Sequence, residues 1–385
     1  MEKRERALEL MQDFARGTGL EPAADHPRRY LWTDAFAVCT YLGLYETTGS
    51  MECRDLALRL IGQVHHTLGR YRDDDARKGW ISGLSSDEGE NHPTAGGLRI
   101  GKSLPERGPG EPHDGQREWD QDGQYYHYLT RWMHALATAG RVTGDPAFTA
   151  WAVDLARAAH ARFTYLPPHG TQKRMYWKMS TDLSRPLVPS MGQHDPLDGL
   201  VTFRELQQAQ GTGTGQPVLV QEIAELAGIG RGLSLETSDP LGTGGLLADA
   251  SRIARLAVQG EPVGPDLLEE VMDAALVGLE AFAGSGLLEL PARYRLAFRE
   301  LGLSAGLAGI EKFPAWIREN PDLSAMAGPL LSRVQALREY VPLRDAIEGF
   351  WLEERNRTAA AWTEHRDINT VSLATSLAPE GFLGR

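Results

Sequence analysis

Hydrophobic residues in the segment from Glu118 to Asp145 recur at the spacing of an α-helix. They fall at positions i, i+4, i+7, i+8 and i+11, on one face of a helix of about five turns. These residues are Tyr125, Leu129, Trp132, Met133 and Leu136. Acidic residues beside a Trp precede the helix, and Gly144-Asp145-Pro146 ends it with residues suited to a C-cap, a new N-cap and a first turn. The segment therefore predicts an acidic loop, a helix, a tight turn and a second helix.

The same pattern recurs along the chain about six times. Helical periods cover residues 1–16, 31–45, 51–71, 147–163, 199–210, 218–229, 266–282 and 368–377, with one helix ending near 258, one starting near Pro291, and interrupted periods over 321–357. Ser50 is a candidate cap for the third of these helices. We find no alternation of β-branched residues long enough to predict a sheet. The sequence therefore predicts an all-α fold of roughly twelve or thirteen helices.

Two segments, residues 72–121 and 164–198, have no convincing period. A loop this long in a compact protein is either functional or disordered, and the two tryptophans of the first segment, Trp80 and Trp119, argue against disorder. We interpret residues 1–385 as a single domain in which both loops lie over the mouth of a cavity.

Composition excludes several classes of partner. A net charge of -12 argues against a nucleic acid, whose phosphates require clustered Lys and Arg. No apolar run approaches the roughly 18 residues that span a bilayer, and the charged N-terminus lacks the apolar core of a secretion signal. Cys39 and Cys53 fall in one early helical hairpin, too far apart for a bridge, which favours free thiols. We therefore expect a cytoplasmic protein without a membrane partner.

Charged residues mark the end of each long connection. They are Asp34, Asp120 and Asp122, Asp195 and Asp198, Asp239, Arg293, and His365 with Asp367. One acid at a helix start is ordinarily a cap favoured by the helix dipole. In a closed series of helical hairpins, however, all the long connections meet at one mouth, where their polar groups converge.

Tryptophans belong to the same set of connections. They are Trp32, Trp80, Trp119, Trp177 and Trp362, five of the nine in the chain. Aromatic faces stack on the C–H faces of sugars, and carboxylates accept hydrogen bonds from hydroxyls. The alternative is that these rings only seal the loops onto the helices.

Helices alternating with acidic, aromatic loops, with T-G-D and T-G-S turns between hairpins, resemble the six-hairpin glycosidase-like superfamily. The resemblance covers nearly the whole chain and implies an (α/α)6 toroid of about six helical hairpins with long loops at one rim. It also implies hydrolysis of glycosidic bonds, usually with inversion, or isomerisation of sugars. The substrate would be a small saccharide or a saccharide-like molecule.

Inverting hydrolysis needs one protonated carboxyl and one ionised carboxylate about 6.5–9.5 Å apart. We predict one from each long loop: Asp120 and Asp195 as the free carboxyls, with Asp122 and Asp198 as helix caps. Asp34 and Glu118 are reserves. Side chains expected to bind the substrate are Trp32, Trp80, Trp119, Tyr125, His127, Arg174, Trp177, His194, Arg293, Trp362 and His365.

Histidines support a second hypothesis, a sugar epimerase or isomerase that uses a His pair beside a carbonyl. His127, His194 and His365 are the candidates, although His127, Arg131 and His134 could equally form the polar stripe of a packed helix. A third hypothesis is a toroid that binds a saccharide or a partner without catalysis. No ligand spacing gathers a metal site, so we predict neither a metal nor a cofactor. The sequence gives no oligomeric state.

Overall fold

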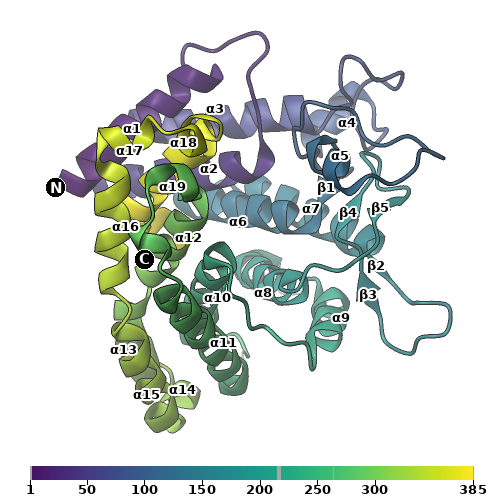
Figure 1. The fold of residues 1–385 in the computed structure, drawn as a ribbon. Coiled ribbons are helices and arrows are strands. Elements are labelled where there is room, and N and C mark those ends of the chain that lie inside the picture. Colours follow the sequence, from purple (N-terminus) through teal and green to yellow (C-terminus); the bar gives the residue numbers. More distant parts are fainter. Residues whose placement is uncertain (1, 215–217, 263, 385) are drawn as a thin grey trace. The chain divides into compact units, whose positions relative to one another are not determined.

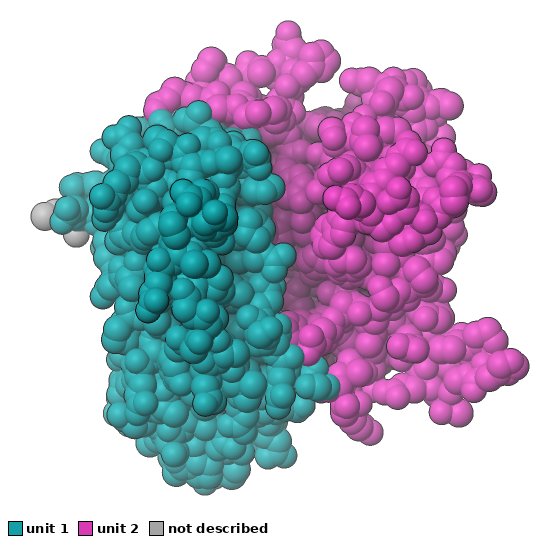
Figure 2. All heavy atoms as spheres, viewed as in Figure 1, with its two compact units in different colours: residues 1–14, 46–49, 234–385 teal, residues 15–45, 50–233 magenta. Residues whose placement is uncertain are grey.

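The computed structural model describes residues 2–214, 218–262 and 264–384, which divide into two compact units (Figure 2). Unit 1 comprises residues 1–14, 46–49 and 234–385, and unit 2 comprises residues 15–45 and 50–233. Helix α1 (Glu2–Thr18) begins in unit 1 and ends in unit 2, and α2 (Leu31–Thr48) begins in unit 2. Both units are predominantly helical, so the predicted all-α class is confirmed. The single closed domain stays a prediction.

Unit 2, whose helices are labelled in Figure 1, holds most of the residues predicted to be functional. Besides α2, its helices are α3 (Met51–Leu68), α4 (Ser86–Asn91), α5 (Gly115–Asp120), α6 (Tyr126–Thr143), α7 (Pro146–Phe163), α8 (Asp195–Thr214) and α9 (Val220–Gly230). Helix α6 packs against α7 and α8, α7 also packs against α8, and α8 packs against α9. The α6–α8 contact positions the candidate site.

The α6–α7 hairpin forms as its sequence predicts. The apolar face of α6 is buried, including Trp132 and Leu136. Gly144 adopts the left-handed conformation at the C-cap, with φ of 75°. Asp145 then caps α7 by accepting a hydrogen bond from the backbone N–H of Ala147. These contacts satisfy backbone groups that a helix end leaves open, so the turn between the two helices is sharp.

Short strands in unit 2 correct the prediction of no sheet. Strands β1 (Gln124–Tyr125), β4 (Lys178–Met179) and β5 (Pro186–Val188) form an antiparallel sheet in the order β1-β4-β5. A second antiparallel pair joins β2 (Thr164–Tyr165) to β3 (Arg174–Met175). Strands of two or three residues are too short to leave an alternating pattern, so periodicity could not predict them. They fold the segment 164–198 into hairpins.

Unit 1 is built from the C-terminal helices. They are α10 (Pro240–Val258), α11 (Pro265–Gly284), α12 (Ala297–Leu307), α13 (Phe313–Glu319), α14 (Pro321–Ala325), α15 (Ala327–Arg338), α16 (Pro342–Leu352), α17 (Glu354–Arg357), α18 (Ala360–Thr363), α19 (Arg366–Leu377) and α20 (Glu380–Leu383), with 3-10 turns η1 (Leu287–Glu289), η2 (Ala292–Tyr294) and η3 (Ile310–Lys312). Helices α10 and α12 approach so closely that a Cβ on Gly244 would lie 2.3 Å from the carbonyl oxygen of Gly302.

Several predicted boundaries were wrong. The helix expected near Pro291 begins at Ala297, after the turn η2, and the interrupted region 321–357 is divided among α14, α15, α16 and α17. Ser50 precedes α3 but makes no side-chain capping bond. Cys39 and Cys53 are buried thiols and are not joined in a disulfide, as predicted. Among the described helices, none combines the length and the apolar character needed to cross a membrane.

Candidate active site

A row of polar side chains lies between α6 and α8, and we name it the α6–α8 seam. Its members are His127, Thr130, Arg131 and His134 on α6, and Asp195, Asp198 and Glu205 on α8. The α6 residues are spaced i, i+3, i+4 and i+7, which places them on one helical face. The first pair is His127 with Asp195 and the last is His134 with Glu205, so the two helices run in the same direction.

The inner part of the seam is closely hydrogen-bonded. The hydroxyl of Thr130 donates to Asp198 Oδ2 at 2.6 Å, and Arg131 lies 3.1 Å from Asp198 Oδ1. Further along the helices, His134 Nδ1 lies 2.8 Å from Glu205 Oε2. Buried polar groups contribute to stability when they are paired in this way. This stretch of the seam therefore holds α6 against α8.

Asp195 differs from these residues. Its side chain is 6% exposed, and its Oδ2 atom has no hydrogen-bond partner among the described residues. Burial and, to a smaller extent, the negative charge of Asp198 raise the pKa of Asp195 to about 8. A hydrogen bond with the Gly192 backbone and the positive charge of Arg131 act to lower it. A helix N-terminus ordinarily favours an ionised carboxylate, but here burial has the larger effect. At neutral pH Asp195 is therefore predominantly protonated.

His127 lies beside this carboxyl, with Nδ1 3.7 Å from Asp195 Oδ1. Burial lowers the pKa of His127 to about 4. The negative charge of Asp198 acts to raise this pKa, and the positive charge of Arg131 acts to lower it. The side chain keeps 30% of its surface accessible, so one part of the ring remains open. The pair therefore places a neutral imidazole next to a protonated carboxyl, and a base and an acid face the same space.

Two glycines allow the backbone to approach this pair. A Cβ on Gly192 would lie 2.4 Å from Asp195 Oδ2, and a Cβ on Gly199 would lie 2.3 Å from the hydroxyl oxygen of Tyr126. Both distances are shorter than van der Waals contact. Only glycine fits at these positions while the two polar side chains keep their places.

Aromatic rings surround His127, and we call this group the aromatic platform. Its members are Tyr30, Trp119, Tyr125, His127, Tyr128 and Trp177. His127 stacks on Tyr125 and Trp177, with centroid distances of 5.3 and 6.2 Å. Trp177 meets Trp119 edge to face at 5.3 Å, and Trp119 is 55% exposed. The platform thus extends from the His127–Asp195 pair to an accessible indole.

Buried ion pairs hold the two tryptophans of the platform. Lys178 is fully buried and donates from Nζ to Glu118 Oε1 at 2.9 Å, while Arg107 donates to Glu118 Oε2 at 2.9 Å. Glu118 precedes Trp119 and Lys178 follows Trp177 in the chain. The same interaction therefore fixes the spacing of both rings, and Glu118, a reserve catalytic residue in the sequence, has a structural role.

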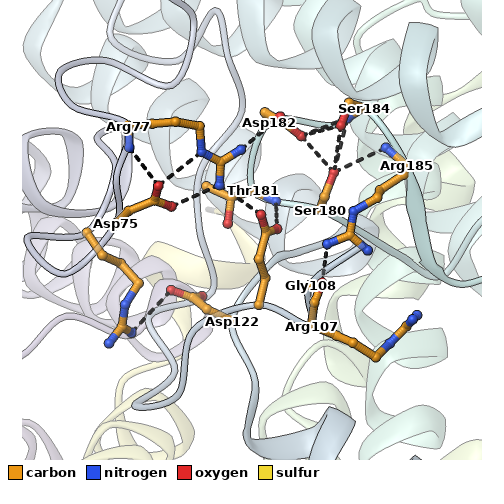
Figure 3. A network of polar contacts seen from close by, with 12 residues as sticks. Asp75, Arg77, Arg107, Gly108, Asp122, Ser180, Thr181, Asp182, Ser184 and Arg185 are labelled. Atoms are coloured by element: carbon orange, nitrogen blue, oxygen red, sulfur yellow. Dashed lines mark hydrogen bonds and ion pairs between the residues drawn. The ribbon is translucent and has the colours of Figure 1, made fainter. Parts of the chain in front are cut away.

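A second ionic network ties the loop 72–121 to the turn after β4 (Figure 3). Arg77 lies between Asp75 and Asp182, at 2.8 and 2.9 Å, and also contacts Glu106 at 2.8 Å. Glu106 in turn accepts a hydrogen bond from the backbone N–H of Thr181. The long loop therefore has a defined path next to the platform, as its tryptophans suggested.

The other predicted carboxylates in unit 2 have different surroundings. Asp122 is not a helix cap as predicted: it is fully buried, pairs with Arg99 and accepts from the backbone N–H of Gly101. Asp34 is buried in the first turn of α2 and accepts from the backbone N–H of Tyr30. Asp198 is not a cap either, because it lies inside α8 and holds Thr130 and Arg131.

Asp120 is exposed at the end of α5. It lines an open surface depression together with Gly115, Gln116 and Trp119. No contact places it beside Asp195, so the predicted pairing of Asp120 with Asp195 stays a prediction. The carboxyl that the structure does set apart, Asp195, is one that the sequence singled out.

Several residues expected to bind the substrate lie in helix packing. Trp32 is buried against Phe36 at a centroid distance of 4.3 Å, and Trp80 is 3% exposed. In unit 1, Trp362 is buried and stacks on Trp351. These three rings seal helices and loops, which was the alternative interpretation of the tryptophan pattern.

The remaining predicted side chains are spread over both units. Arg174 is exposed on β3, and His194, half-buried, immediately precedes Asp195. In unit 1, Arg293 is exposed over the ring of Tyr294, and His365 is exposed at the start of α19. Asp239 caps α10 and pairs with Arg299.

Sequence reasoning missed Tyr30, Tyr126 and Tyr128. The run Tyr125-Tyr126-His127-Tyr128 was a signal, because four consecutive ring side chains at a helix start cannot all face one core. Tyr30 came from a different connection and could not be linked to it. Its hydroxyl lies 2.6 Å from that of Tyr128.

Across residues 2–214, 218–262 and 264–384, no three His, Cys, Asp or Glu side chains gather as a metal site would require.

Two solved structures are similar to this chain. One is a sugar epimerase from a ruminal bacterium, with 12% identity, a TM-score of 0.43, and coverage of 82% of this chain and 75% of that one. The other is the cellobiose 2-epimerase from Spirochaeta thermophila, with 12% identity, a TM-score of 0.46, and coverage of 89% and 98%. No protein-family model and no curated protein matches the sequence. At this level of identity the likeness concerns the fold and does not extend to residues of the site.

Proposed function

We propose that this protein is a carbohydrate-active enzyme that isomerises or epimerises a sugar by proton transfer at the carbon next to its carbonyl. One observation carries the proposal: a neutral imidazole, His127, lies 3.7 Å from a carboxyl, Asp195, whose pKa burial raises to about 8. Enolisation of a sugar requires a base for the carbon-bound proton and an acid for the carbonyl oxygen. Both groups are present in the required protonation states at neutral pH.

The proton balance follows from these two side chains. His127 accepts the proton from C2 of an open-chain aldose, and the electron pair of the C–H bond becomes the C1–C2 double bond. Asp195 gives its proton to the carbonyl oxygen, which leaves an enediol between an imidazolium and a carboxylate. Opposite charges at this separation in a buried site stabilise each other. Protonation of the opposite face of C2, with return of the O1 proton to Asp195, gives the epimer, whereas protonation of the original face restores the starting aldose. Delivery of the proton to C1, with transfer of the O2 proton to Asp195, gives the ketose.

The aromatic platform supports a sugar as the substrate. Tyr125, Tyr128 and Trp177 flank His127, and Trp119 continues the platform toward solvent. Aromatic faces bind the C–H faces of a sugar ring, while tyrosine hydroxyls can exchange hydrogen bonds with its hydroxyls. A substrate held on these rings would present its carbonyl end to the His127–Asp195 pair.

Glycoside hydrolysis is the second candidate, because a carboxyl that keeps its proton at neutral pH is also what protonates a leaving glycosidic oxygen. That reaction needs a second carboxylate to activate water. Asp122 and Asp198 already hold arginines, and Asp34 is buried, so Asp120 would have to serve. The imidazole beside Asp195 favours isomerisation, since it supplies the base without a second carboxylate.

Incubation with aldoses and disaccharides in D2O tests the proposal. Epimerisation by this route should place deuterium at C2 and isomerisation should place it at C1 of the ketose, each in a new sugar that NMR and mass spectrometry detect. His127→Asn and Asp195→Asn are the matched negative controls. Release of new reducing ends from glycosides without deuterium at C1 or C2 would favour hydrolysis. Sugar binding without either reaction would contradict both candidates and indicate a binding protein.

A further inference from the structure

Tyr126, the first residue of α6, has a buried hydroxyl that the fold does not use. The side chain is 0% exposed, its ring packs edge to face on Phe163 of α7 at 5.4 Å, and its hydroxyl has no hydrogen-bond partner among the described residues. An unpaired buried hydroxyl lowers stability, and phenylalanine would fill the same space without that cost. The hydroxyl therefore calls for an explanation other than packing.

The position of this hydroxyl connects it with Asp195. It lies against α8 at Gly199, where a Cβ would come within 2.3 Å of it. Gly199 is four residues after Asp195, so both are on the same face of α8, one turn apart. Burial is the main reason that the pKa of Tyr126 lies well above its ordinary value. The charge of Asp195 has the strongest effect among the neighbouring charges and acts in the same direction. The phenol thus remains a hydrogen-bond donor at every physiological pH.

The two nearby carboxyl groups differ in how far their acceptor atoms are already used. Asp198 already binds Thr130 through Oδ2 and Arg131 through Oδ1. Asp195 Oδ2, in contrast, has no partner among the residues that the structure describes. The α6–α8 contact therefore holds two buried polar atoms without partners among the described residues. One is a donor, the hydroxyl of Tyr126, and the other is an acceptor, Asp195 Oδ2.

We propose that Tyr126 is a positioning residue for Asp195, and that its hydroxyl donates a hydrogen bond to Oδ2 once Asp195 has given up its proton. The inference rests on the proposed role of Asp195 as proton donor. A protonated carboxyl gains little from such a donor, whereas a buried carboxylate gains much. The hydrogen bond thus favours the charged state that the reaction creates, which is how a preorganised donor accelerates a step.

Tyr126→Phe in the full chain tests this role, with Tyr41→Phe as the matched control because Tyr41 is fully buried on α2. The titration of Asp195 is followed by carbon-13 NMR of labelled aspartate carboxyls, with Asp195→Asn to assign the signal. The titratable and charged groups around Asp195 are His127, Arg131 and Asp198, with His194 next to it in the chain, and all are unchanged in both variants. Any difference therefore reports on the hydroxyl.

Loss of a hydrogen bond to the carboxylate should raise the Asp195 midpoint by about one pH unit in Tyr126→Phe, and leave it unchanged in Tyr41→Phe. Turnover of a sugar substrate should fall about tenfold, while the melting temperature at pH 6 stays the same or rises. An unchanged midpoint with unchanged turnover would overturn the inference. If Tyr126→Phe does not fold, Gly199→Ala, whose methyl group displaces the hydroxyl, should raise the midpoint in the same direction, and a constant midpoint there would overturn it too.

The two proposals fail separately. A raised midpoint in a protein that exchanges no sugar proton would leave the positioning role standing and contradict the proposed function. If the protein turns over a sugar but Tyr126→Phe and the unsubstituted chain have identical Asp195 midpoints and rates, the proposed function would stand and the positioning role would be contradicted.

Discussion

Each end of the α6–α8 seam pairs a histidine with a carboxyl side chain, but one pair is closed and the other is open. At one end His134 and Glu205 are 4% and 7% exposed and 2.8 Å apart, a closed pair. At the other end His127 and Asp195 are 3.7 Å apart, Asp195 Oδ2 has no partner in the described part of the chain, and the imidazole is partly accessible. A buried pair with good geometry stabilises a fold, whereas an incomplete pair costs stability and persists where chemistry uses it. The difference supports the proposed role of the open end as the reactive one.

The Lys178–Glu118 interaction strengthens the comparison. Both side chains are buried, as Asp195 is, yet each side-chain nitrogen and oxygen of the pair has a short contact, including 2.7 Å from Lys178 Nζ to the carbonyl oxygen of Glu118. Burial by itself therefore does not mark a site. What marks it is burial with an unused donor or acceptor beside an accessible group.

The largest expected effect is on turnover. His127→Asn should lower the rate of proton exchange from a sugar substrate by about 10²–10⁴-fold, because general base catalysis is lost while a polar side chain is kept. The rate of deuterium incorporation at C1 or C2 measures it. A rate within a factor of two of the unsubstituted chain would remove His127 from the mechanism.

The next effect is on stability. Lys178→Met should destabilise the protein by about 3 kcal/mol or more, since it leaves the Glu118 carboxylate buried without its lysine. Denaturant unfolding gives the free energy. Arg355→Met, at an 81% exposed ion pair, is the control and should change it very little. Equal effects of the two substitutions would contradict a structural role for Lys178.

A smaller loss of stability is expected from a substitution at the closed end of the seam. Glu205→Gln should cost about 1–3 kcal/mol through the weakened bond to His134, and leave sugar turnover at constant temperature essentially unchanged. The pair of measurements separates structure from chemistry along one helix. A loss of turnover comparable to that of His127→Asn would mean that the two ends do not differ as described.

The smallest effect concerns the exposed end of the platform. Trp119→Ala should weaken sugar binding about fivefold by removing a stacking face, with no measurable change in unfolding free energy, because the ring is 55% exposed. Calorimetric titration with a disaccharide measures the affinity. Tyr294→Ala, an exposed aromatic in unit 1, is the control and should leave binding intact. Unaltered affinity in Trp119→Ala would exclude its ring from the substrate site.

Local patterns were readable from the sequence. The periodicity of α6, the Gly144–Asp145 turn and the spacing of His127, Arg131 and His134 all depend on residues close in the chain. Asp195 was also identified, as a carboxyl at the start of an apolar helix. These features follow from helix geometry and capping, which act within a few residues.

Features that depend on distant partners were not readable. Asp122 looked like a cap, but Arg99, 23 residues earlier, binds it instead. Tyr126 and Gly199 meet only because α8 packs on α6, and the strands of two residues lie in loops whose contacts to Arg77 and Lys178 come from distant parts of the chain. Tertiary contacts determine which of several similar carboxyl groups keeps an oxygen without a hydrogen-bond partner, and no local sequence pattern predicts which one it is.

The pH dependence of stability tests most directly whether Asp195 keeps its proton at neutral pH. Its folded pKa, about 8, lies above the roughly 3.9 of an unfolded chain, so the folded state binds the extra proton and stability falls as pH rises through that window. Asp195→Asn removes this slope and leaves the histidine contributions in place. Between about pH 6.5 and 8, the unsubstituted chain should lose about 2 kcal/mol of unfolding free energy relative to Asp195→Asn. Parallel curves over that range would contradict a protonated Asp195.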